Sequence, residues 1–222
     1  MDYKLNLISQ QAAYELTITS QKAIDTILLQ SNQAVDLLSI YDNVCKVNRM
    51  EHELNLMTLK VDSADIKKVQ LKMRTAEGQQ GSLNAFVIEK KQGSDDAMCA
   101  LLEIPLKPLN LHERITGLSA FELQKLPLSR IVLSGRFSQQ DGLQWISNCI
   151  PNVPNVISDS NMSTLTFTFR SSFTKTYLIV EIEEGAVTVQ SDNFSVMTIF
   201  KDQLSADASQ RKIALDIQSE LN

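Results

Sequence analysis

The sequence predicts an antiparallel β-sandwich over residues 1–108, followed by an α+β domain over residues 109–222. Two observations predict the sandwich: short segments of the first half alternate apolar and polar residues, and polar stretches containing glycine separate them. In the second half, similar segments are mixed with stretches of helical periodicity, which is typical of helices that cover a sheet. Pro105 and Pro108 mark the predicted boundary, because proline cannot donate a hydrogen bond to a strand ladder.

Alternation is clearest in residues 13–19, where Tyr14, Leu16 and Ile18 share one face of a predicted strand. Further strands of the first half are predicted at 53–60, 68–75, 81–90 and 97–104. We also expect residues 25–31 and 34–40 to form a hairpin, closed by the polar turn Ser31–Gln33.

The second half begins with a predicted strand at residues 128–137 and continues into a helix over residues 138–150. Ser138 and Asp141 have the spacing of a capping box, although the second position usually holds Glu or Gln. The helix is expected to bury an apolar stripe of Leu143, Ile146, Cys149 and Ile150. Three strands at 163–170, 175–184 and 185–191, a second helix at 195–205 and a last strand at 211–218 complete the prediction.

Trp145 is the candidate partner contact. It is the only tryptophan, and it lies at the margin of the apolar stripe of the first helix. It either completes the core or presents a rigid aromatic anchor, a role in which tryptophan is enriched at interfaces. Replacement by alanine would distinguish the two: weaker binding at unchanged stability indicates an anchor, and a large loss of stability indicates core. For Phe167, Phe169 and Phe173 the core alternative is favoured.

No residue pattern indicates catalysis, a cofactor or a metal site. His52 and His112 lack neighbouring Cys, His or Asp residues at metal-ligand spacing. The adjacent carboxylates Asp95–Asp96 and Glu183–Glu184 stand beside glycine at predicted turns, where a solvated loop is expected. A nucleophile elbow, a phosphate-binding loop and a dinucleotide fingerprint are all missing. We therefore predict a non-enzyme, with a hydrolase of unrecognised site as the alternative.

Charge and hydropathy exclude two further classes of partner. The formal net charge is −5 and no Lys/Arg run is longer than two, which argues against a nucleic-acid partner. No apolar run approaches the roughly 18–20 residues that cross a bilayer, which argues against direct membrane insertion.

Five stretches, in order along the chain, together resemble the family of Bardet-Biedl syndrome protein seven, a subunit of the BBSome. The resemblance rests on their number and order, because none is an active-site motif. They are "AYELTIT…AIDTILLQS…VDLLSI" (13–40), "RTAEGQQGSLNAFV" (74–87), "LKPLNLHER" (106–114), "LSGRFSQQDGLQWISNCIPNVP" (133–154) and "SDNFSVMTIFKDQLSADASQRKIALDI" (191–217).

The resemblance implies a γ-adaptin-ear-like sandwich, similar to an immunoglobulin fold, followed by an appendage platform domain. It also implies a scaffold role in a coat-like adaptor that carries membrane proteins to and from cilia. The implied partners are other BBSome subunits, notably subunit two, with ciliary membrane-protein cargo engaged through the whole complex. The implied locations are the cytoplasm, the ciliary base and, peripherally, the ciliary membrane. Alternatives are the paralogous BBSome subunit two and a peptide-binding appendage of another clathrin- or coatomer-type adaptor.

Overall fold

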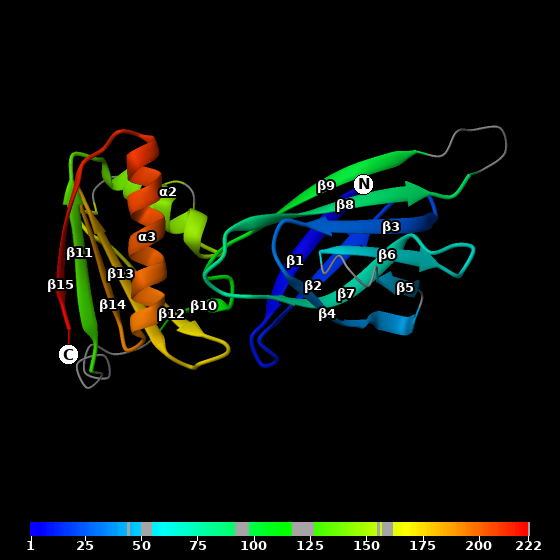
Figure 1. Ribbon diagram of the computed structural model, residues 1–222, viewed down its shortest axis with the longest axis horizontal. Coiled ribbons are helices and arrows are strands. Elements are labelled where there is room, and N and C mark those ends of the chain that lie inside the picture. Colours follow the sequence, from blue (N-terminus) through cyan, green and yellow to red (C-terminus); the bar gives the residue numbers. More distant parts are fainter. Residues whose placement is uncertain are drawn as a thin grey trace. The chain divides into compact units, whose positions relative to one another are not determined.

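The computed structural model describes residues 1–43, 45–49, 55–91, 98–116, 127–154, 156 and 162–221. The chain separates into two compact units, Met1–Leu106 and Lys107–Asn222 (Figure 1). The first unit is built from two antiparallel sheets, and the second combines one antiparallel sheet with two helices in its described part. The predicted fold class, a β-sandwich followed by an α+β domain, is confirmed.

Two sheets form the first unit. Sheet A has the strand order β1 (Asp2–Ile8), β2 (Ala13–Thr19), β7 (Lys68–Thr75), β4 (Val35–Ile40). Sheet B has the order β5 (Cys45–Arg49), β6 (Leu56–Val61), β3 (Ile24–Ser31), β8 (Gly81–Glu89), β9 (Cys99–Leu106). A short 3-10 turn, η1 (Tyr41–Asn43), follows β4.

The core of the first unit lies between the buried faces of these sheets. Alternate residues of β2 and β7 are buried, among them Leu16, Ile18 and Leu71, which are fully inaccessible. In sheet B, Ile27 and Leu83 are likewise fully inaccessible. Each such side chain contributes about 1.5–3 kcal/mol when it leaves water, so burial of these alternating residues stabilises the packing of the two sheets.

The predicted hairpin over residues 25–40 is wrong. β3 belongs to sheet B and pairs with β6 and β8, whereas β4 belongs to sheet A and pairs with β7. The polar segment between them therefore carries the chain from one sheet to the other. Both segments are strands, as the alternation predicts, but alternation does not tell which strand is the neighbour.

Polar side chains of this crossing segment form hydrogen bonds with the residues that lead from β7 in sheet A into β8 in sheet B. The Asn32 Oδ1 accepts the Ser82 N–H at 2.8 Å, and the Gln33 Nε2 donates to the Gln80 carbonyl at 3.2 Å. A Cβ at Gly81 would lie 2.3 Å from the Asn32 Oδ1, so the contact requires glycine there. These hydrogen bonds join the two segments that carry the chain between sheet A and sheet B.

Pro105 does not end its strand, because β9 continues to Leu106. β9 is an edge strand of sheet B, and Pro105 stands opposite Ser82 of β8. An edge strand tolerates proline, since its second side needs no ladder hydrogen bonds.

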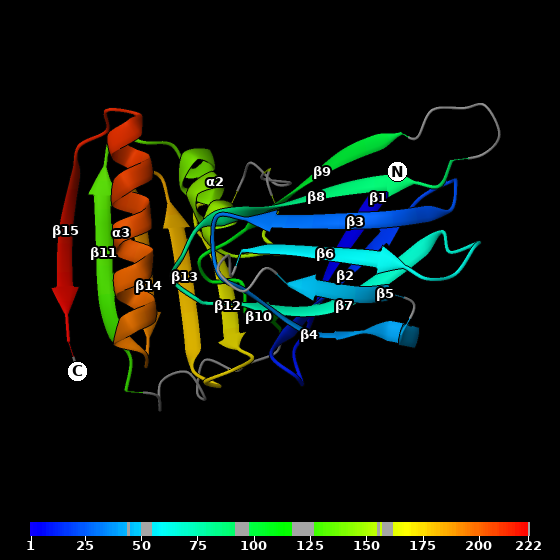
Figure 2. The same ribbon diagram turned by 45° about the vertical axis from the view of Figure 1, so that its right-hand side comes forward.

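The second unit contains sheet C, whose helices α2 (Gln139–Cys149) and α3 (Phe194–Gln210) cover one face (Figure 2). α2 packs on β13 and β14, and α3 on β14 and β11. The strand order of the sheet is β10 (His112–Ile115), β12 (Leu165–Ser171), β13 (Tyr177–Glu183), β14 (Ala186–Ser191), β11 (Ser129–Gly135), β15 (Leu215–Glu220).

Every element predicted for the second half is present, with shifted ends. The second helix is longer than predicted, and the last strand begins at Leu215 because residues 211–214 form the turn that follows α3. β10 was not predicted. It lies at a sheet edge beside β12. With four residues, it is too short to show the alternating run that identifies longer strands.

Candidate interaction surface

α2 begins with the capping box that the sequence predicts. The Ser138 hydroxyl accepts the Asp141 N–H at 3.1 Å. The Asp141 Oδ2 in turn accepts the Ser138 N–H at 3.1 Å and the Ser138 Oγ–H at 2.6 Å. Asp therefore replaces the usual Glu without loss of the reciprocal bond, and the start of the helix is fixed.

The other end of α2 is closed by Lys107. Its ammonium donates to the carbonyl of Ser147 and, at 3.2 Å, to the carbonyl of Ile150. These carbonyls lie at the negative end of the helix dipole, where a cation is favourable. Burial lowers the pKa of Lys107, so the carbonyl bonds compensate for lost hydration.

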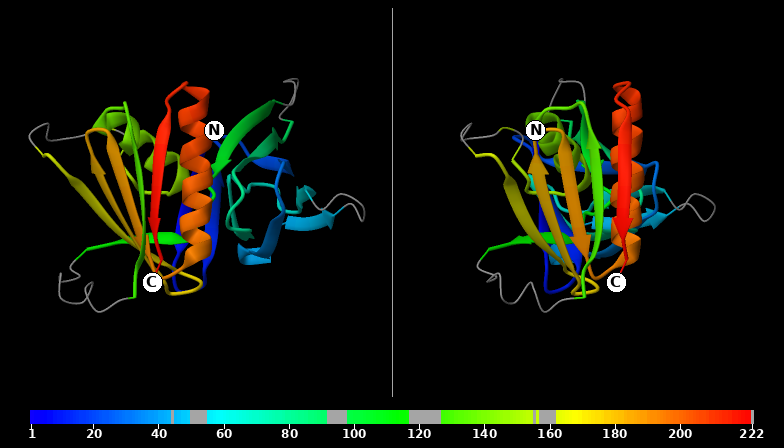
Figure 3. Two further views of the ribbon diagram at one scale, coloured as in Figure 1. Left: turned by 60° about the vertical axis from the view of Figure 1, so that its left-hand side comes forward. Right: turned by 90° about the vertical axis from the view of Figure 1, so that its left-hand side faces the viewer.

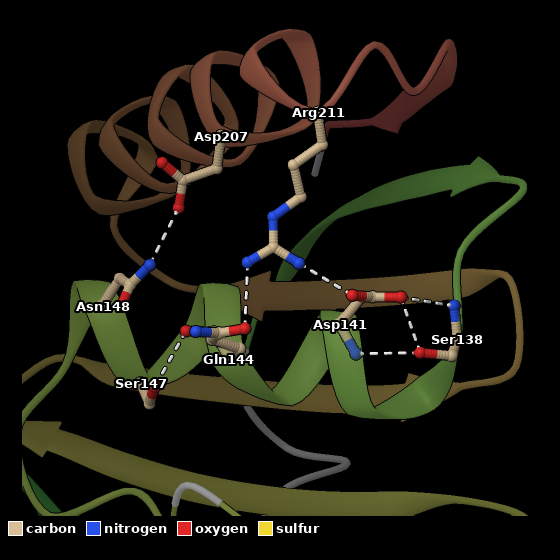
Figure 4. A network of polar contacts seen from close by, with 7 residues as sticks. All are labelled: Ser138, Asp141, Gln144, Ser147, Asn148, Asp207 and Arg211. Atoms are coloured by element: carbon tan, nitrogen blue, oxygen red, sulfur yellow. Dashed lines mark hydrogen bonds and ion pairs between the residues drawn. The ribbon is translucent and has the colours of Figure 1, made fainter.

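Polar contacts join α2 to the end of α3 (Figure 4). The Arg211 guanidinium donates to the Asp141 Oδ1 at 2.7 Å and to the Gln144 Oε1 at 2.9 Å. The Asn148 Nδ2 donates to the Asp207 Oδ2 at 3.2 Å. The pKa of Asp141 is lowered, first by the Ser138 hydroxyl, then by the Ser138 N–H and by Arg211. The network holds the two helices at a fixed spacing on the sheet.

The lowered pKa of Asp141 predicts a pH dependence of stability. A carboxyl whose folded pKa lies below its unfolded value stabilises the fold above the unfolded pKa, and this contribution disappears as pH falls through the folded pKa. The carboxylate is one-third exposed, so Asp141→Asn should cost only about 1 kcal/mol at pH 7. Urea unfolding should show this difference shrinking as the pH falls through the lowered pKa of Asp141, where the carboxylate becomes protonated. A difference that stays constant with pH contradicts the assignment.

Trp145 lies in the core of the second unit and is 1% exposed. Its ring packs against Phe137 with centroids 4.8 Å apart and planes inclined at 55°. The Arg211 guanidinium lies 6.0 Å from the ring centroid, so the polar network also covers the indole. Burial favours the core alternative, and a partner contact through Trp145 stays a prediction.

The three phenylalanines divide differently from the prediction. Phe167 and Phe169 are buried, as expected. Phe173 is 63% exposed, so its assignment to the core is wrong. It follows the alternating run of β12 in sequence but lies in the turn after the strand, and periodicity cannot show where a strand stops.

Phe194 is a second exposed aromatic residue, and no pattern in the sequence singles it out. It is 60% exposed and is the first residue of α3. The sequence predicts a helix that begins at residue 195, so Phe194 falls just outside it.

Phe173 and Phe194 lie at the same end of sheet C, and we call this end the aromatic end. One ring belongs to the β12–β13 turn and the other to the β14–α3 turn, which are adjacent because Leu178 pairs with Ser191. The Tyr177 N–H donates to the Asp192 carboxylate at 2.8 Å, which ties the two turns together.

Hydroxyl and amide side chains fix the backbone beneath both rings. The Ser171 Oγ accepts the N–H groups of Phe173 and Thr174 at 3.3 and 3.2 Å. The Asn193 side chain caps α3 by accepting the Ser195 N–H at 3.0 Å. Large rings presented from an ordered backbone lose little entropy on binding, which suits them to a protein contact.

The candidates for chemistry that lie within the described residues are not brought together. Within the described ranges, no three His, Cys, Asp or Glu residues are placed to hold a metal ion. His112 is 1% exposed in β10, while His52, Asp95 and Asp96 lie outside the described residues.

The remaining predicted pair has a structural role. Glu184 accepts the N–H of Gln139 at the start of α2 at 3.0 Å, and Glu183 accepts the Thr164 hydroxyl at 2.9 Å. A carboxylate at a helix N-terminus complements the helix dipole.

Neither of the helices in the described part of the chain is long and apolar enough to span a bilayer.

A β-sandwich followed by a unit in which two helices cover one face of an antiparallel sheet is the architecture of an appendage-type region. Family models agree with this class: residues 1–100 match the BBS7 GAE domain, and residues 112–220 match the BBS7 platform domain. The chain belongs to the BBS7 family. The resemblance seen in the sequence is therefore confirmed.

Two curated relatives support the assignment. The chain is 34% identical over 159 residues to "BBSome complex member BBS7" of Mus musculus. This alignment covers 72% of the chain and 21% of the relative. It is 26% identical over 161 residues to "BBSome complex member bbs-7" of Caenorhabditis elegans, with the same shares covered. The matched region spans about a fifth of the length of each relative.

Proposed function

We propose that the chain is a scaffold and protein-interaction region of a BBSome subunit and carries out no catalysis and binds no cofactor. The complex is a coat-like adaptor that moves membrane proteins to and from cilia. The match to the GAE and platform domains of BBS7 is the observation that carries the proposal. The names of both relatives, each a BBSome complex member, support it.

The proposal includes the domain limits and the location. Residues 1–108 act as the GAE domain and residues 109–222 as the platform domain. The chain works in the cytoplasm, at the ciliary base and peripherally at the ciliary membrane, which it reaches through the complex. Cargo is engaged by the whole complex.

The aromatic end is the surface that the geometry best supports for a contact with another subunit. Monomeric surfaces expose single apolar residues commonly, but two phenylalanine rings on adjacent, hydrogen-bonded turns offer a larger apolar area. Phenylalanine, with other aromatic residues, is enriched where protein interfaces exclude water. We assign subunit two as the partner at this surface.

The double variant Phe173→Ser/Phe194→Ser tests the assignment. Calorimetric titration with the GAE–platform fragment of subunit two should show binding weakened by at least about tenfold, because both anchors are lost. Thermal stability should stay close to that of the wild type, since both side chains are exposed.

Met162→Ser is the matched control. Met162 is 54% exposed and precedes β12, so it belongs to the opposite end of sheet C. Its substitution should leave binding unchanged. Equal binding of the double variant and the wild type would exclude the aromatic end, and absence of any binding to subunit two would contradict that partner.

A further inference from the structure

β15 presents an open strand edge. It is the last strand on one side of sheet C, and it pairs with β11 alone among the described strands. Every residue of β15 after Leu215 is exposed. The strand faces the viewer in the right panel of Figure 3. An edge strand directs alternate N–H and C=O groups outward, where another extended chain can pair with them.

The apolar side of the sheet continues onto β15 but is uncovered there. Ile217 stands opposite Leu133 of β11, which is 1% exposed and part of the core. Ile217 itself is 40% exposed. An added strand with an apolar residue beside Ile217 would extend the buried layer by one strand.

A depression of about 730 Å³ lies where β15 begins. Arg136 and Lys212 line it, together with Ile213, Leu215 and Asp216. No hydrogen bond or ion pair joins the side chain of Arg136 or Lys212 to another part of the chain that the structure describes. Arg211, by contrast, is fully engaged with Asp141 and Gln144. The depression thus carries two cations against the one carboxylate of Asp216, a net positive charge in a chain whose net charge is −5.

Lys212 is held in this position by the end of α3. The Ile213 N–H donates to the Ala208 carbonyl at 2.9 Å and the Lys212 N–H to the Ser209 carbonyl at 3.0 Å, the bonds of a Schellman motif. Lys212 has φ of 57° at the position that usually holds glycine. The motif therefore presents a cation from a backbone conformation that disfavours lysine.

We propose that β15 accepts an extended segment of a partner protein as an added antiparallel strand, with an acidic residue of that segment in the depression lined by Arg136 and Lys212. The open edge supplies backbone pairing, Ile217 supplies an apolar contact, and the two cations select the charge. The proposal rests on the scaffold role and names the chemistry of one partner.

Charge argues against a second copy of the chain as the occupant. Antiparallel pairing of two β15 strands centred on Gln218 places Asp216 of each opposite Glu220 of the other. Like charges directly opposite each other destabilise a strand pair. A segment that carries its carboxylate at the depression avoids this repulsion.

The test uses a fluorescein-labelled peptide of alternating valine and threonine that ends in two glutamates, with a glutamine-ended peptide for comparison. Fluorescence anisotropy with the 222-residue chain should show tighter binding of the glutamate peptide. Added salt should weaken that preference, because the contact is exposed. Hydrogen exchange of the β15 amides should slow when the peptide binds.

Lys212→Gly and Arg136→Gln should each weaken glutamate-peptide binding about two- to fivefold, as expected for a partly exposed ion pair. Lys212→Gly should also melt at a higher temperature, because glycine suits φ of 57°, so unfolding cannot explain its weaker binding. Lys201→Gln removes a lysine of α3 whose side chain is 39% exposed, and it should leave peptide binding and the melting temperature unchanged.

Equal affinity for the two peptides, or no binding, overturns the proposal. Dimerisation that Ile217→Lys abolishes, without peptide binding, overturns it in favour of a second copy. These results leave the scaffold role standing, because the calorimetric titration with subunit two tests that role separately.

Discussion

Replacing Trp145 with alanine should lower the free energy of unfolding of the second unit by about 3–5 kcal/mol, the range for large aromatic residues truncated in a core. The indole is 1% exposed, packs on Phe137 and is overlain by the Arg211 guanidinium. The substitution therefore leaves a cavity beneath the polar network that joins the helices. Far-UV circular dichroism in urea measures the change, because the variant lacks the only tryptophan.

Phe194→Ala is the control for this experiment. It removes an aromatic ring that is 60% exposed in the same unit and should change stability by no more than about 0.5 kcal/mol. If Trp145→Ala unfolds at the same urea concentration as the wild type and binds a partner less tightly, Trp145 is an interface anchor after all.

Gly142→Leu should cost about 1–3 kcal/mol, because it overfills the contact between α2 and the sheet. A Cβ at Gly142 would lie 2.8 Å from the Ile182 Cγ2 and 3.3 Å from the Val187 Cγ2. Those atoms belong to β13 and β14, on which α2 packs. A longer side chain must displace the helix or the two strands, and urea unfolding measures the loss.

Gly142→Ala separates crowding from helix propensity. Alanine gains about 1 kcal/mol over glycine inside a helix, which offsets its smaller clash, so we expect a change near zero. Gln140→Leu, at an exposed position of the same helix, should also be nearly neutral. Equal stability of Gly142→Leu and the wild type would show that α2 does not approach the sheet as closely as the structure indicates.

Local signals predicted the elements of the second half well. The Ser138 and Asp141 pair predicts the start of its helix, because a capping box involves only residues close in the sequence. The same holds for β12 to β14, where alternation coincides with burial. Strand pairing between distant segments is harder to predict. The segment after Ser31 could close a hairpin or cross between the sheets, and its contacts with the distant residues Gln80 and Ser82 fix the crossing.

The exposure of single aromatic side chains is hard to predict from the sequence for a related reason. Trp145 and Phe173 are both apolar residues beside a periodic run, yet one is 1% and the other 63% exposed. Exposure depends on where a strand turns and on what packs from distant elements, such as Arg211 over Trp145. The depression beside β15 likewise combines residues near positions 135 and 213, which no local pattern relates.

A chimeric subunit tests the scaffold role most directly. The chain would replace the matching region of mouse BBS7, which leaves the remaining four-fifths of that relative unchanged. Purification through a tag on the chimera should recover the other BBSome subunits in the same ratios as the unaltered mouse subunit does. A chimera that folds and accumulates normally but recovers no other subunit would contradict the account.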